Sequence, residues 1–281
     1  MFESSVELTR EQVEWLNECT EGTWKLNPQT GLVDVDGDFD CNHEGLSDFK
    51  GVRFGVIKRD FECRSNQLTT LVGAPQEVGG YFNCGHNQLT TLVGAPQKVG
   101  EYFSCSHNQL ISLKGAPREV RGSFWCNYNQ LSSLEGAPQE VGGGFNCQNN
   151  QLTSLEGAPQ EVGGVFWCGH NQLTSLEGAP REVRGDFSCS DNQLTTLEGA
   201  PQKVGGGFDC DNNPVSEETL KSIFSRMNEG ESYMKTVESL WTEIPLEDQI
   251  LLYRPEFEWV GADEGKKLDA LRAYQGFKGM I

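Results

Sequence analysis

The sequence predicts a repeat solenoid built on a parallel β-sheet. One pattern of 21 residues recurs from residue 61 to residue 213. Every copy begins with Phe-x-Cys, and an asparagine follows three residues after each cysteine. The phenylalanines that open the copies are Phe61, Phe82, Phe103, Phe124, Phe145, Phe166, Phe187 and Phe208. A fixed period in this range is typical of stacked coils that bury a continuous core between neighbours.

Each part of the repeat predicts one part of a coil. In the copy F-N-C-G-H-N-Q-L-T-T-L-V-G-A-P that starts at Phe82, the alternation Phe-x-Cys has the period of a strand. Phenylalanine and cysteine therefore point inward, and their neighbours point outward. We expect Asn87 and its equivalents to satisfy buried backbone groups where the coil turns. Leu89 and Leu92 continue the core, and G-A-P supplies a turn.

This pattern resembles the leucine-rich repeat, L-x-x-L-x-L-x-x-N-x-L, with Phe and Cys in place of two leucines. The resemblance covers about residues 39–213, which we divide into about nine coils. The short period and the proline are similar to the bacterial type. Near-identical copies with the wording N-Q-L-T-S-L-E-G-A-P also resemble uncharacterised repeat proteins of bacteriophages and environmental bacteria. The resemblance implies a parallel sheet on a concave face, a mostly irregular convex side and a phage origin, but no known activity.

Residues 1–38 are predicted to form an N-terminal cap. Thr9 and Gln12 fit a capping box, so we expect a helix over residues 9–18. Trp24 and Leu26 are expected to pack at the same end. The segment 32–41 is predicted to be a strand that leads into the first coil. Its aspartates at alternate positions do not match an EF-hand loop, and we expect them to share one exposed face without binding metal.

The first coil departs from the repeat, since Glu44 replaces the asparagine and Phe49 replaces a leucine. After Asn213 and Pro214, the sequence predicts a helical C-terminal segment over residues 214–281. Its first helix starts near Ser216 with acidic residues in the first turn. We expect this segment to cap the array, or to form a second interaction surface or a homodimer contact.

Composition limits the class of partner. The formal net charge is −19, and acids outnumber bases in all three parts of the chain (1–60, 61–212 and 213–281). Such a surface disfavours direct contact with nucleic acid and with anionic membranes, and it attracts a basic partner. Nine of the ten cysteines share one repeat position, so we interpret them as buried hydrophobes rather than disulfides. No signal peptide or membrane span is recognisable, and we expect a cytoplasmic protein, in the host cytoplasm if phage-encoded.

No catalytic or cofactor motif stands out. The sequence contains no phosphate loop and no H-E-x-x-H, and the part after Cys210 contains no cysteine that could serve a ubiquitin-ligase activity. Each histidine follows two residues after a repeat cysteine, but an inward cysteine and an outward histidine diverge. We therefore expect no enzyme activity, no metal and no cofactor.

The outward positions that the repeat does not fix carry the functional signal. Aromatic and histidine side chains gather there in the middle coils, and acidic side chains gather in the end coils. The candidate partner-binding residues are Tyr81, Tyr102, Trp125, Tyr128, Trp167, His86, His107 and His170. Exposed tryptophan and tyrosine are enriched in binding hot spots. We expect these side chains to share one surface that binds a protein or peptide partner with a basic patch.

Two other functions stay open at this point. The aromatic and histidine side chains could stack a nucleotide-like small molecule and sequester it. The acidic surface could instead mimic DNA and occupy a nucleic-acid-binding protein.

Overall fold

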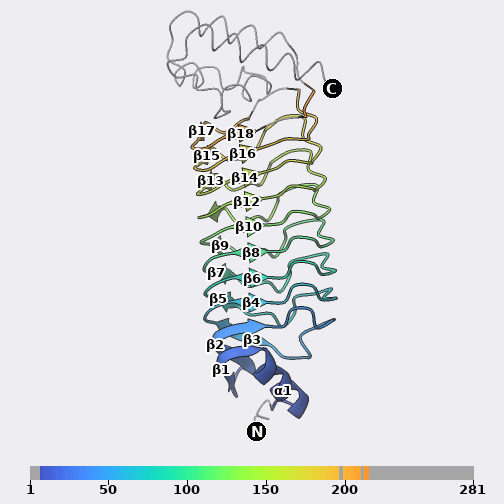
Figure 1. Cartoon of the computed structure of the whole chain (residues 1–281), viewed down its shortest axis with the longest axis vertical. Helices are drawn as coiled ribbons and strands as arrows, with labels where there is room; N and C mark the ends of the chain where they lie inside the picture. Colours follow the sequence, from blue (N-terminus) through green and yellow to red (C-terminus); the bar gives the residue numbers. More distant parts are fainter. Residues whose placement is uncertain (1–6, 196–198, 210–211, 215–281) are drawn as a thin grey trace, which may run out of the picture.

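The structure is a computed structural model that describes residues 7–195, 199–209 and 212–214. It is a parallel β-solenoid of about eight turns (Figure 1). Turns of 21 residues stack along the long axis, and each turn contributes two short strands, one to each of two parallel ladders. The predicted C-terminal helical segment lies outside the described residues, apart from Pro214.

The first ladder, the Phe ladder, is the sheet that the Phe-x-Cys pattern predicts. Its strands are β4 (Phe61–Glu62), β6 (Phe82–Asn83), β8 (Phe103–Ser104), β10 (Phe124–Trp125), β12 (Phe145–Asn146), β14 (Phe166–Trp167), β16 (Phe187–Ser188) and β18 (Phe208–Asp209). They pair in parallel with no shift in register, so that Phe103 lies beside Phe82 and Phe124. The phenylalanine rings stack inside the solenoid, 5.3 Å apart for the first of these pairs and 5.1 Å for the second.

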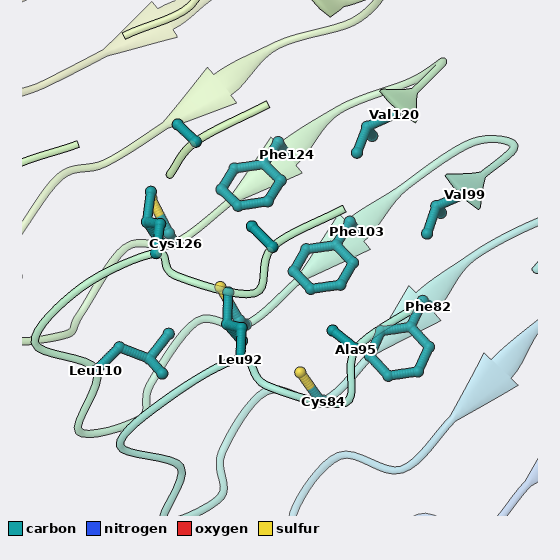
Figure 2. Packing of buried hydrophobic residues seen from close by; sticks show 14 of the residues in the cluster. Phe82, Cys84, Leu92, Ala95, Val99, Phe103, Leu110, Val120, Phe124 and Cys126 are labelled. Atoms are coloured by element: carbon teal, nitrogen blue, oxygen red, sulfur yellow. The ribbon is translucent and has the colours of Figure 1, made fainter. Parts of the chain in front are cut away.

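The second ladder, the Val ladder, was not predicted. Its strands are β3 (Phe54–Ile57), β5 (Glu77–Val78), β7 (Lys98–Val99), β9 (Glu119–Val120), β11 (Glu140–Val141), β13 (Glu161–Val162), β15 (Glu182–Val183) and β17 (Lys203–Val204). The single valine of each later strand points into the core beside the phenylalanines, as Val99 and Val120 do in Figure 2, whereas in β3 Ile57 is buried and Val56 is exposed. From β5 onward each strand has only two residues, which is too short for an alternating pattern to reveal it.

Buried asparagines form a ladder at the turn that follows each cysteine. The Asn150 side chain donates to the carbonyls of Cys126 (3.1 Å), Cys147 (3.0 Å) and Gln148 (3.3 Å). Its oxygen accepts the N–H of Leu131 at 3.0 Å. Since two of these partners belong to the preceding turn, each asparagine both closes its own turn and joins it to its neighbour. The predicted role of the asparagines is confirmed.

The repeat cysteines lie in the core, as predicted. All nine cysteines in the described residues are buried. The thiol of Cys84 donates to the carbonyl of Ser104 in the next turn at 3.3 Å, and five further cysteines repeat this bond. Opposite the strands, the G-A-P turn needs glycine. Gly94 has φ +98°, and a Cβ there would lie 2.6 Å from the carbonyl oxygen of Leu71.

The N-terminal segment packs onto the same core. The helix α1 (Arg10–Cys19) begins with the predicted capping box between Thr9 and Gln12. It buries Trp15, whose ring lies 5.2 Å from that of Phe39 and meets it edge to face. The strand β1 (Thr20–Asn27) pairs antiparallel with β2 (Leu32–Asp40), and β2 starts both ladders because it pairs with β3 and with β4.

The departures from the repeat in the first coil have structural roles. The Glu44 carboxylate accepts the indole N–H of Trp15 at 2.8 Å and the thiol of Cys19 at 3.3 Å, so it joins α1 to the first turn. The aspartates of β2 lie on the outer side, as predicted. Asp34 accepts the N–H of Val56, and Asp36 pairs with Lys58 at 2.6 Å. The described part of the chain has no helix with the length and apolarity needed to cross a bilayer.

A first prediction concerns the asparagine ladder. Asn150→Ser leaves the Leu131 N–H and up to three carbonyls without their partner, because serine is too short to reach them. We expect the unfolding free energy, measured in urea, to fall by about 2–4 kcal/mol. The adjacent Asn149 is the matched control, since its side chain makes no hydrogen bond in the described residues and Ser65 occupies the same position in another turn. An equal loss in Asn149→Ser would contradict the assigned role.

A second prediction concerns pH. Burial raises the pKa of eight thiols, those of Cys19, Cys41, Cys63, Cys84, Cys105, Cys126, Cys147 and Cys168. Unfolded thiols ionise near pH 8.5, so the native state holds these protons to higher pH. Their contribution to stability is complete below about pH 8.5 and falls above it by about 1.4 kcal/mol per thiol per pH unit. The unfolding free energy, measured by urea denaturation from neutral pH to about pH 9.5, gives this slope. Cys84→Ala removes one buried thiol and should reduce the slope by the contribution of that thiol.

Candidate binding face

The ladder face is the outer side of the Phe ladder. It comprises, in each turn, the residue before the phenylalanine, the residue between phenylalanine and cysteine, and the two residues after cysteine. These positions face away from the core because phenylalanine, cysteine and asparagine point inward at the positions between them. All eight candidate residues from the sequence lie on this face.

Three of them form an edge-to-face aromatic row. The Tyr81 ring meets that of Tyr102 at 6.1 Å, and Tyr102 meets Trp125 at 5.1 Å, both at 89°. Tyr81 is 41% exposed, whereas Tyr102 and Trp125 are partly buried against the face. Burial raises the pKa of the Tyr102 hydroxyl to about 12, so this phenol stays neutral at physiological pH.

Three others form a second row, in which the rings stack face to face. The His86 and His107 rings are 4.1 Å apart, and the His107 and Tyr128 rings are 4.2 Å apart, with planes within 11° of parallel. Partial burial and the neighbouring His86 lower the pKa of His107, so its imidazole is neutral at pH 7. We call His86, His107 and Tyr128 the ring stack.

The ring stack stands on an unusual backbone. The second residue after each repeat cysteine has a left-handed conformation, with φ between 52° and 58° from Ser65 to Asn212. Asparagine, aspartate and histidine tolerate this region, but for a bulky side chain such as that of Tyr128 it is an outlier that costs about 1–2 kcal/mol. All eight turns of the Phe ladder share this conformation, so it belongs to the repeat, and only the choice of a bulky residue at Tyr128 is unusual.

A polar strip separates the two rows. The hydroxyls of Ser104 and Ser106 lie 3.3 Å apart, and Ser106 donates to the Asn127 side chain at 2.5 Å. These positions were predicted to be free outward positions, but Ser104 is 4% exposed and Asn146 is 5% exposed. Larger side chains in the neighbouring turns cover these short ones, so only the long side chains of the face are accessible.

Trp167 and His170 lie farther along the same face. In the described residues neither makes a ring contact with the aromatic row or the ring stack. The Nε2 atom of His170 lies 3.4 Å from a carboxylate oxygen of Asp191. The sequence-predicted set is therefore one group of six rings in two rows and a pair of residues beyond it.

Charge on the ladder face is arranged along the axis. Acids lie near both ends, at Asp60 and Glu62 and at Asp186, Asp191 and Asp209, while the turns between them carry neutral side chains. Burial is the largest influence on Glu62 and raises its pKa. Arg64 is the one basic residue among the described positions of the face. None of the described residues forms a group of three or more potential metal ligands.

A second surface feature was missed from the sequence. A shallow groove of about 660 Å³ runs along the outside of the Val ladder between Arg121 and Arg184. The glycines Gly142 and Gly163 stand between these arginines and leave room for it. The motif R-E-V-R, which occurs at 118–121 and 181–184 but not in the two turns between, is the signal that marks its ends.

No protein-family model matches this sequence, and a search of the curated proteins finds no match either.

A third prediction tests whether the face rings serve the fold. Asparagine occupies the Trp125 position in two other turns (Asn83 and Asn146) and the Tyr128 position in two (Asn149 and Asn212). Trp125→Asn and Tyr128→Asn should each change the unfolding free energy by less than about 1 kcal/mol, since lost ring contacts are small or offset by relief of strain. Phe124→Ala should lower it by about 3–5 kcal/mol. Comparable losses at Trp125 and Phe124 would show that the face rings are structural.

Proposed function

We propose that this chain is a non-enzymatic binding protein whose ladder face recognises a protein or peptide partner. The aromatic row and the ring stack would form the centre of the contact, and the acidic ends would select a partner with a basic patch. The observation that carries this proposal is the gathering of six contacting rings at positions that the repeat leaves variable. In other turns the same positions hold Ser, Gly, Asn, Asp, Glu or Val, and rings recur there only at Trp167 and His170.

The physical argument rests on what the fold requires. The core phenylalanines and asparagines hold the backbone of the face rigidly, so its rings are pre-organised and lose little conformational entropy on binding. Large amphipathic rings on such a surface are typical hot-spot residues. The neutral centre with acidic ends favours a complementary basic surface and faster association with it.

The finer proposals rest on the resemblance. We propose that the solenoid is of the short leucine-rich-repeat type, and that α1 and β1 cap its N-terminal end. Similarity to phage repeat proteins supports a host protein as the partner, such as a defence component. The buried thiols of the core are consistent with the reducing environment of the cytoplasm.

Sequestration of a nucleotide-like molecule is the second candidate, and the ring stack favours it because planar rings stack on one another. The charge of the face favours a protein partner instead, since Arg64 is the one described base there to meet a phosphate. Mimicry of DNA has less support, because the carboxylates are grouped at the ends rather than spread along the face.

A fourth prediction tests the ladder face directly. Tagged wild-type protein should recover a specific partner from host lysate, and the double variant Trp125→Asn/Trp167→Asn should recover at least tenfold less, which corresponds to about 1.4 kcal/mol. Recovery should also fall at high salt, because the charge complementarity is screened.

The matched control is Val72→Glu/Val93→Glu. These exposed valines lie in the turns that precede G-A-P, away from the ladder face, and Glu135, Glu156 and Glu177 occupy the same position in other turns. The control should recover the partner as the wild type does. If both double variants behave alike, the ladder face is not the binding surface.

A further inference from the structure

We infer that Tyr128, Asn149 and His170 form a slot for the guanidinium group of an arginine side chain of the partner. The inference rests on the proposed function, because it assigns part of the ladder face to one chemical group of a basic protein. It goes beyond that proposal in naming the group and the residues that hold it.

The slot follows from the order of residues on successive turns. Tyr128, Asn149 and His170 occupy the same repeat position and share the same left-handed backbone, with φ of 55°, 55° and 52°. In the preceding turns this position carries the His86 and His107 rings of the stack. The stack therefore ends at Tyr128, the short amide of Asn149 stands where the next ring would be, and a ring returns at His170.

The spacing suits a planar group. Consecutive rings of the stack are 4.1–4.2 Å apart. Two steps place Tyr128 and His170 roughly 8–10 Å apart along the ladder, by the spacing of parallel strands. A planar group in contact with a ring on each side needs about 7–8 Å between those rings. Tyr128 is 48% exposed, which leaves its ring open to such a ligand.

The polar groups at the slot suit a donor. In the described residues the Asn149 side chain makes no hydrogen bond, so its amide oxygen is available as an acceptor. Beyond His170 lies the Asp191 carboxylate, 3.4 Å from the imidazole Nε2. A guanidinium group has five N–H donors in one plane and no acceptor, so it can stack on Tyr128 while donating to the Asn149 amide oxygen, and the Asp191 carboxylate on the far side of His170 adds negative charge nearby.

Charge distinguishes arginine from other planar ligands. No described lysine or arginine of the ladder face lies in the turns from Tyr128 to Asp191, so a phosphate would meet no cation there. The net charge of −19 opposes anions further. A lysine ammonium has the favoured charge but no flat face, and it forms a weaker contact in a slot of this shape.

The slot also accounts for the residue at position 128. Tyrosine in a left-handed conformation is costly, and the neighbouring turn uses asparagine at the same point without strain of this size. A tyrosine ring there supplies the best open face for a cation among the residues of this column.

The test uses three peptides and the whole chain. The probe is a Gly/Ser peptide whose only charged side chains are spaced arginines. A second peptide has lysine in place of each arginine, and a third has citrulline. Lysine keeps the charge without the plane, and citrulline keeps the plane without the charge. We expect calorimetry at physiological salt to give about three- to tenfold tighter binding for arginine than for lysine, and weaker binding for citrulline than for arginine.

Two variants and one control locate the effect. Asn149→His continues the ring stack through the slot, and Tyr128→Asn removes one wall; each should reduce the arginine-to-lysine preference to about one. Ser65→His makes the same kind of change at the other end of the stack and should keep the full preference. His86, His107 and His170 show that the backbone accepts histidine at this position.

Equal binding of arginine and lysine peptides by the wild type would overturn the slot, and so would an undiminished preference in Asn149→His. These outcomes are separable from failure of the proposed function. If the Trp125→Asn/Trp167→Asn variant loses the partner but the wild type shows no preference for arginine peptides, the ladder face is supported as the binding surface and the slot is rejected. If the wild type prefers arginine peptides but the same variant recovers the partner as the wild type does, the slot is supported and the proposed aromatic centre of the contact is rejected.

Discussion

The asparagine ladder is the constraint on which the rest of this structure depends. A coil of 21 residues must turn its backbone inside the core, where water cannot reach its N–H and C=O groups. From Asn87 to Asn192 each ladder asparagine satisfies such groups with four hydrogen bonds, and Asn150, for example, makes two of them to the turn before it. Because the same bonds close one turn and join it to its neighbour, the turns stack in a single register. The phenylalanine and cysteine columns follow from that register.

Because the register is the same in every turn, the inward residues that form the core are distinct from the outward residues of the ladder face. Inward positions hardly change from turn to turn, whereas the ladder face changes in every turn. Side chains at equivalent positions lie one strand spacing apart, so rings in successive turns meet without any loop to place them. His86, His107 and Tyr128 form a parallel stack for this reason. The chemistry of the ladder face is therefore determined by which residue occupies each turn of a fixed scaffold.

At the N-terminal end, the chain departs from the repeat pattern at a position that contacts another element. At Glu44 a carboxylate replaces the ladder asparagine and binds Trp15 and Cys19 of α1. The N–H of Leu46 still donates to the Asn66 oxygen at 3.0 Å, as the equivalent leucines do in later turns, and the N–H of Glu44 adds a second bond to that oxygen at 3.1 Å. One substitution thus connects two kinds of structure, a helix and a solenoid turn, through the same repeat position.

The sequence by itself determined the solenoid, the inward phenylalanines and cysteines, the role of the asparagines and the helix that begins after Thr9. Each of these follows from a local pattern. The capping box predicts the helix, and the same periodicity recurs in every copy of the repeat. It also identified the eight candidate residues of the ladder face. Only the tertiary structure decided that six of the rings meet in two rows, that Ser104 and Asn146 are covered, and that Glu-Val forms a second ladder. These outcomes depend on contacts between residues about 21 positions apart and on the direction of each side chain, which no local pattern encodes.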